Sequence, residues 1–221
     1  MHSQGKGVPQ ALLQAWGLAS PSRRGPKARL GLADVVSAAV ELADEVGLSG
    51  VTLAKLARRL GLATTGLYRY VDDKEVLDEL LIDAALGPPP QLQPGQAEHR
   101  VQALSEALWS RYETHPWLVT RPLQGVPRGP NAYHWLAEFV QELQDLGDAH
   151  PVGTAVAIDT LVRGFAQQSF VSTNADLDPA IVAELGRRYP AVFGAGVEQP
   201  QIEPKADLFE AIDRLVSHRW S

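Results

Sequence analysis

Hydrophobic positions recur three and four residues apart along most of the chain, and this spacing predicts an all-α protein. In residues 32–46, valines and alanines follow this period, and Gly47 then supplies a left-handed stop. No segment shows the two-residue alternation that is typical of a half-buried β-strand. The predicted helices span about 32–46, 52–60, 64–70, 74–85, 98–114, 129–146, 151–173, 178–189 and 205–219.

Helix-breaking residues divide the chain into three parts. Residues 1–29 are polar and interrupted by Gly, Pro and Ser, which predicts a disordered basic arm. A second break, the linker from Pro88 to Gln96, contains three consecutive prolines and disfavours helix. We expect a small helical domain at 30–75 and a larger one at 76–221, and the linker lies within the larger domain.

The segment from Val51 to Lys74 has the pattern of a helix-turn-helix. Its two short helices are broken at Gly61, and Thr52 is a plausible N-cap for the first of them. Such a unit places its second helix in the major groove of DNA. If Leu67 anchors that helix to the first one, four side chains are left facing outward, namely Thr64, Thr65, Tyr68 and Arg69.

The charge distribution supports a nucleic-acid partner at this end of the chain. The whole protein of 221 residues has a formal net charge of −6, which by itself argues against nucleic acid. Residues 1–74, however, hold ten Lys/Arg against six Asp/Glu, a net of +4, whereas residues 75–221 carry −10. A basic N-terminal part followed by an acidic remainder is typical of a polyanion-binding protein.

Other classes of protein find little support in the sequence. There is no run of eighteen apolar residues, no signal peptide and no cysteine, so we expect a cytoplasmic protein with no membrane contact. No nucleophile elbow or phosphate-binding glycine loop occurs, so an enzyme is not expected, and Asp159 and Arg163 are interpreted as a helix ion pair. His134 and Glu138 are four residues apart but lack further ligands, so no metal and no cofactor are predicted.

The chain resembles the TetR family of bacterial repressors. The residues that carry the resemblance are Leu56-Ala57, Leu60-Gly61-Leu62, Leu67-Tyr68-x-Tyr70 and Asp73-Lys74. By this resemblance, Thr52, Tyr68 and Lys74 match positions that contact the DNA backbone, whereas Thr64, Thr65 and Arg69 match the base-reading face. The basic arm, including Arg29, is expected to reach the minor groove or the phosphates, with a solubilising tail as the alternative.

The resemblance also implies that residues 76–221 bind a small effector and form a dimer. Aromatic and polar side chains on the presumed inner helix faces are the candidates for a pocket, although any of them also fits an ordinary core. Apolar stripes at 151–173 and 205–219 fit either a dimer interface or the core. The pocket candidates are Trp109, Tyr112, His115, Tyr133, His134, Phe139, Phe165 and Gln168.

Together these patterns predict a ligand-responsive transcriptional regulator. The expected partners are double-stranded DNA with a palindromic operator, a small hydrophobic or amphipathic effector that releases the protein from DNA, and a second copy of the chain. A repressor is the usual outcome in the family, with activation left open. The competing hypothesis is a helical ligand-binding module that has lost DNA binding, against which Tyr68 and Lys74 argue.

Overall fold

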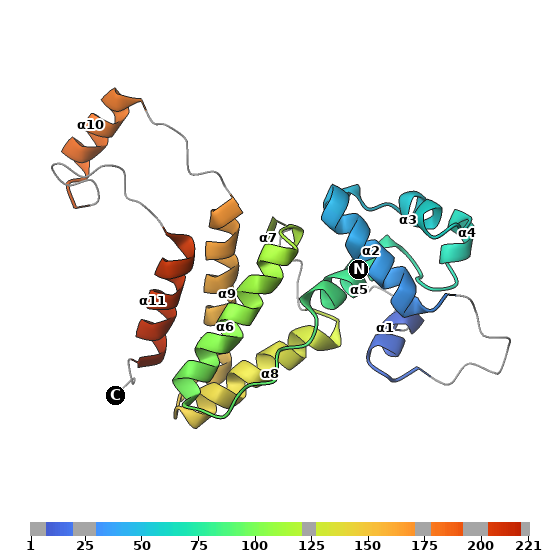
Figure 1. Cartoon of the computed structure of the whole chain (residues 1–221), viewed down its shortest axis with the longest axis horizontal. Coiled ribbons are helices and arrows are strands. Elements are labelled where there is room, and N and C mark those ends of the chain that lie inside the picture. Colours follow the sequence, from blue (N-terminus) through green and yellow to red (C-terminus); the bar gives the residue numbers. More distant parts are fainter. Residues whose placement is uncertain (1–7, 20–29, 121–126, 171–177, 192–202, 218–221) are drawn as a thin grey trace, which may run out of the picture.

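The computed structural model is helical, as the hydrophobic spacing predicts (Figure 1). It describes residues 8–19, 30–120, 127–170, 178–191 and 203–217, and no strand occurs within these ranges. The helices are α1 (Gln10–Ala15), α2 (Leu32–Val46), α3 (Leu53–Arg59), α4 (Thr64–Leu67), α5 (Lys74–Leu86), α6 (Ala97–Thr114), α7 (Trp117–Thr120), α8 (Pro130–Asp145), α9 (Pro151–Phe170), α10 (Pro179–Arg188) and α11 (Pro204–Ser217), with a 3-10 turn at Leu48–Gly50.

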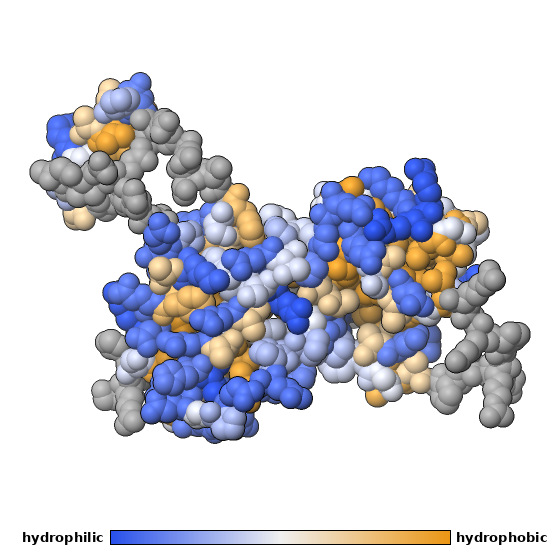
Figure 2. Space-filling view, viewed as in Figure 1, coloured by the Kyte–Doolittle hydropathy of each residue, from blue (hydrophilic) through white to orange (hydrophobic). Residues whose placement is uncertain are grey.

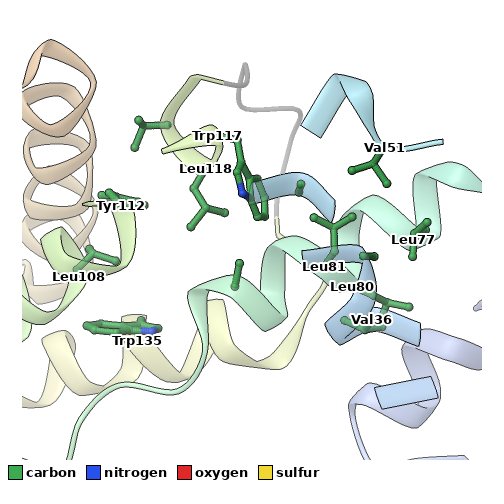
Figure 3. Close-up of a cluster of buried hydrophobic side chains, with 14 of the residues drawn as sticks. Val36, Val51, Leu77, Leu80, Leu81, Leu108, Tyr112, Trp117, Leu118 and Trp135 are labelled. Carbon is green, nitrogen blue, oxygen red and sulfur yellow. The ribbon is translucent and has the colours of Figure 1, made fainter. Parts of the chain in front are cut away.

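Residues 30–75, which we call the head, contain α2, α3, α4 and the start of α5. Thr52 caps α3, since its Oγ1 accepts a hydrogen bond from the backbone N–H of Lys55 at 3.2 Å. Gly61 then turns the chain with φ +66°, a left-handed conformation that costs glycine little. Leu56 and Leu67 are fully buried and hold α4 against α3. Figure 3 shows the side of this core where Val36 and Val51 face the leucines of α5.

Residues 76–217, which we call the body, are built around α6, α8, α9 and α11, and α5 runs into this bundle from the head (Figure 1). Hydrophilic side chains cover most of the visible face of α6 and α8 (Figure 2). The apolar stripes of α9 and α11 point into the core of the same chain, because their residues are almost completely buried. These residues are Ala155, Ile158, Val162, Leu208 and Ile212.

The prediction of a disordered arm over residues 1–29 is wrong for its middle part. Residues 10–15 form α1, and Ala11 and Leu12 are buried where this helix packs against α5. Trp16 extends the contact, since its Nε1 donates to the carbonyl of Arg128 at 2.8 Å. The helix forms because its apolar residues find a nonpolar surface that only the folded chain provides. Residues 1–7 and 20–29, including Arg29, lie outside the described residues.

Helix α10 has no buried residue and lies apart from the other helices in Figure 1. Its surface is amphipathic, with Ile181 and Tyr189 exposed. None of the helices in the described ranges is both long and apolar enough to cross a membrane.

Candidate nucleic-acid interface and effector domain

The second helix of the helix-turn-helix presents a polar face to solvent. Thr64, Thr65, Tyr68 and Arg69 are all exposed, while Leu67 between them is fully buried. Tyr68 and Arg69 follow the last helical residue, so α4 is shorter than predicted and its final turn is not α-helical. These four side chains are the ones expected to face outward. Their orientation leaves hydroxyl and guanidinium groups free to approach base edges or phosphates.

Two ion pairs that do not involve this polar face join α2 to α3. Arg59 of α3 bonds Glu41 and Glu45 of α2 with N–O distances of 3.0 and 2.9 Å. Arg59 therefore has a structural role within the head. Tyr70 is partly buried and packs against the core of the head.

Lys74 stands at the first residue of α5, next to the N-cap Asp73, whose Oδ1 accepts from the N–H of Val76 at 2.9 Å. Its ammonium group pairs with Asp78 one turn further along the helix. The side chain is about one-third exposed and lies at a helix N-terminus, where backbone N–H groups favour an anion. The position is therefore suited to a DNA phosphate.

Helix α5 connects the Lys74 position to the body through polar contacts at its other end. Trp135 of α8 donates its Nε1–H to the carbonyl of Gly87 at 2.8 Å. Asp83 accepts from the backbone N–H groups of Asn131 and Ala132 at 2.9 and 3.3 Å, at the first turn of α8. These hydrogen bonds tie the C-terminal half of the helix that carries Lys74 to α8.

The eight predicted pocket residues do not surround one cavity in the part of the chain that the structure describes. Trp109, Tyr112 and Phe139 are buried. Tyr133 and His134 are on the outer side of α8, where Tyr133 stacks against Trp16 with 5.7 Å between ring centroids and His134 pairs with Glu138. Phe165 and Gln168 line a shallow hollow on α9, and His115 lies at the contact with the head. Spacing along single helices gave no information on how these helices are arranged.

A buried polar cluster lies between α6 and α9. The Tyr112 hydroxyl donates to Asp159 Oδ1 at 3.3 Å, and the Arg163 guanidinium stands 5.3 Å from the Tyr112 ring centroid. Burial raises the pKa of both Tyr112 and Asp159. Asp159 and Arg163 make no direct ion pair, since Asp159 accepts from Tyr112 and Arg163 Nη1 donates to the carbonyl of Leu118 at 2.7 Å, but the Arg163 charge still favours the ionised form of Asp159.

One contact between the head and the body was not predicted from the sequence. Asp44 of α2 accepts two hydrogen bonds on Oδ1, one from Trp117 Nε1 and one from His115 Nδ1, each at 2.7 Å. Asp44 is more than seventy positions from both His115 and Trp117, so no local spacing in the sequence predicts this contact. Among the described residues no cluster of three or more His, Cys, Asp or Glu is placed to hold a metal ion.

A helix-turn-helix with an exposed polar second helix, joined by α5 to a larger helical bundle, is the architecture of a DNA-binding regulator. Residues 35–79 match the sequence profile of the bacterial regulatory proteins of the tetR family. The chain is 31% identical over 178 residues to the HTH-type transcriptional repressor DrrR1 of Streptomyces coeruleorubidus, a match that covers 76% of this chain and 64% of that protein, just under two thirds of its length.

Two further comparisons agree with this match. An HTH-type transcriptional regulator of Saccharopolyspora erythraea is 31% identical over 176 residues, covering 72% of each protein. The structure of the TetR family protein ActR of Streptomyces coelicolor in complex with (S)-DNPA superposes with a TM-score of 0.70 at 21% identity, covering 86% of this chain and 97% of ActR. The chain belongs to the TetR family of transcriptional regulators, whose members are not enzymes.

Proposed function

We propose that the protein is a repressor that binds a palindromic DNA operator as a homodimer and is released by a small hydrophobic or amphipathic effector. The observation that carries this proposal is the exposed polar face of the helix-turn-helix, formed by Thr64, Thr65, Tyr68 and Arg69, together with Lys74 at the start of α5. In it, residues 30–75 bind DNA and residues 76–221 bind the effector and the second copy.

The proposed DNA contacts divide by reach and chemistry. Thr64, Thr65 and Arg69 read base edges, since hydroxyls fit either base and an arginine fork fits guanine. Thr52, Tyr68 and Lys74 contact phosphates, which fixes the register of the head on the duplex without reading sequence. These residues lie in adjacent elements of the head, and all are exposed except Lys74, which is about one-third exposed.

The basic arm, with Arg29, is proposed to add phosphate or minor-groove contacts. Arg29 itself lies outside the described residues, so this contact stays a prediction from charge and position in the sequence. Deleting residues 20–29 is expected to flatten the salt dependence of operator binding, since fewer counterions are released. An unchanged slope would remove the arm from the DNA interface.

Dimerisation is proposed to use the outward face of α9, since the apolar stripe of that helix is already buried in the monomer. Val152 and Val156 are more than half exposed on this face. Gly153 and Gly164 lie in open space beside them and allow close approach of a second helix. A two-fold dimer would place two recognition helices about 34–36 Å apart, one turn of DNA.

The effector is proposed to bind in the body, close to the buried polar cluster of α6 and α9. Two buried donors, Trp109 Nε1 and Arg163 Nε, have no hydrogen-bond partner among the described residues. An effector with an apolar frame and oxygen acceptors suits such surroundings. The structural neighbour ActR is in complex with (S)-DNPA, which supports a small-molecule ligand for this chain. Release follows if the effector prefers a dimer whose heads are wrongly spaced.

The proposal is tested with DNA from the region upstream of the protein's own gene. Footprinting is expected to show a protected palindrome, and Arg69→Ala is expected to weaken binding by about five-fold or more, because a bidentate base contact contributes about 1–3 kcal/mol. Arg187→Ala is the matched control, since Arg187 is an exposed arginine of α10 that pairs with Glu184. A missing footprint, or equal affinity of both variants, would overturn the proposal.

The dimer is tested separately. Wild-type protein is expected to have twice the 23.9 kDa mass of the chain by native mass spectrometry. Val156→Glu places a charge on the exposed face of α9 and is expected to give monomers that bind the operator weakly. Ile181→Glu, at an equally exposed position of α10, is the control and is expected to remain dimeric.

A further inference from the structure

The corner between α6 and α7 touches both the DNA-binding head and the α9 helix of the body. We define this corner as residues 115–118, which connect the end of α6 to the first turn of α7. Trp117 and Leu118 are almost fully buried in it. Figure 3 shows both side chains there, with the Trp117 ring next to the α2 ribbon. The corner is therefore packed between two parts of the molecule that are proposed to bind different ligands.

On the side of the head, the corner is fixed by Asp44. Its Oδ1 accepts the N–H of Trp117 and bonds His115 Nδ1, both at 2.7 Å. Because an ionised carboxylate only accepts and indole only donates, His115 carries its proton on Nδ1 in this arrangement. The Trp117 N–H would be left buried without a partner if Asp44 moved away. The corner and the last turn of α2 therefore move together.

On the side of the body, the corner is fixed by Arg163. The Nη1 group of this α9 residue donates to the carbonyl of Leu118 at 2.7 Å. The same guanidinium lies over the ring of Tyr112, which in turn bonds Asp159. Any shift of α9 along or about its axis moves the Arg163 donor relative to Leu118 and pulls the corner with it.

Movement of Asp44 is passed to the recognition helix because the head is stiff. Glu41 and Glu45, which lie in the same helix as Asp44, hold Arg59 of α3. Helix α3 in turn packs against α4. A rotation of α2 therefore turns the whole helix-turn-helix instead of bending it.

We propose that Asp44 is a positioning residue for DNA binding, which aligns the head with α9 through the corner formed by His115, Trp117 and Leu118. The inference rests on the proposed function, in which α9 responds to the dimer and to the effector. It adds a second connection to the one through α5. Head orientation is then set at two points, one at each end of the head–body contact, so neither helix alone determines the spacing of the recognition helices.

The proposal predicts communication between two residues that do not touch each other or DNA. A double-mutant cycle with Asp44→Ala and Arg163→Met measures it, because independent sites give multiplied effects and coupled sites do not. Each single variant is expected to shift the affinity for the upstream DNA at least five-fold in the same direction. The double variant is expected to lie within two-fold of the larger single effect.

Asp34→Ala is the matched control, since it removes a carboxylate at the other end of the same helix, where it accepts the backbone N–H of Gly31. Its effect is expected to multiply with that of Arg163→Met. Trp117→Phe keeps the ring and removes only the N–H, and it is expected to shift affinity in the same direction as Asp44→Ala. Single variants that bind like wild type, or a double variant that equals the product of the singles, would overturn the proposal.

A readout without DNA separates this inference from the proposed function. Arg163→Met is expected to speed amide hydrogen exchange of residues 43–47 at least five-fold in the free protein, because the corner no longer holds Asp44 in place. Equal exchange in wild type and variant would contradict the positioning role even if the protein binds its operator. A wild-type protein that fails to bind DNA would instead overturn the proposed function and leave the exchange result to decide the inference.

Discussion

The carboxylate of Asp83 in α5 accepts hydrogen bonds from both the backbone and the side-chain amide of Asn131 in α8, at 2.9 and 3.0 Å. Asp83 thereby caps a helix that belongs to another part of the fold, at the end where an acid is favoured. Gly129 precedes this cap, and a Cβ at that position would stand 2.3 Å from the Asp83 carboxylate. Helix α5 is thus joined to α8 by a contact that leaves no room for a side chain at position 129.

Asn131→Ala is expected to destabilise the folded protein by about 1–2 kcal/mol, because the substitution removes two hydrogen bonds from the side-chain amide to a buried partner. Urea unfolding followed by circular dichroism measures the loss. Gln141→Ala is the control, since Gln141 bonds Asp145 on an exposed part of the same helix. If both variants lose the same free energy of unfolding, the hydrogen bonds between Asn131 and Asp83 stabilise the protein no more than an exposed pair does.

Lys74→Gln is expected to weaken operator binding and to reduce its dependence on salt. One neutralised phosphate contributes about 0.9 to the slope of log K against log salt concentration. Fluorescence anisotropy at several salt concentrations gives both values. Lys205→Gln removes a lysine of α11 in the body and is expected to keep the wild-type slope. An unchanged slope in Lys74→Gln would exclude this side chain from the phosphate contacts.

Trp16→Phe is expected to loosen α1, because phenylalanine retains an aromatic ring near Tyr133 but has no N–H for the Arg128 carbonyl. The lost hydrogen bond contributes about 1 kcal/mol, which corresponds to about five-fold faster amide exchange over residues 10–15. Leu18→Ala, at an exposed position just after this helix, is the control. Exchange that responds equally to both substitutions would contradict the docking role of Trp16.

Most of the fold was predictable from local pattern. The helices from α2 to α11 with a full apolar stripe lie within a few residues of the predicted ranges, since periodicity and breakers such as Gly47 act locally. Two helices were missed for physical reasons. Helix α1 has six residues and α7 has four, so neither is long enough to show a period. Both form because tertiary contacts bury Leu12 and Trp117.

The sequence predicted the orientation of the polar residues of the helix-turn-helix, but it did not predict how the pocket candidates are arranged in space. The outward orientation of Tyr68 and Arg69 follows from Leu67, the buried last residue of α4, which directly precedes them. The pocket candidates required the relative arrangement of three helices, α6, α8 and α9, which no single helix encodes. His115 illustrates this point, because its partner Asp44 lies 71 residues away in another part of the fold.

Asp159→Asn is expected to change how stability depends on pH. Burial raises the pKa of Asp159 in the folded protein above the ordinary carboxyl value of 3.8. In the pH range between 3.8 and this raised pKa, the folded protein binds more protons than the unfolded chain. The free energy of unfolding of the wild type therefore falls as pH rises through this window, and the full penalty remains above it. Asparagine carries no charge at any of these pH values. The variant is expected to become progressively more stable relative to wild type as pH rises above 3.8.

Thermal unfolding of both proteins over the acidic range measures this difference, and the sign of its slope decides the prediction. Asp213→Asn removes an exposed carboxylate of α11 and gives the background for loss of one negative charge. Tyr112 remains able to donate to the asparagine oxygen, so the variant keeps the hydrogen bond of the buried cluster. A wild type that gains stability relative to Asp159→Asn with rising pH would show that Arg163 outweighs burial and holds the carboxylate charged.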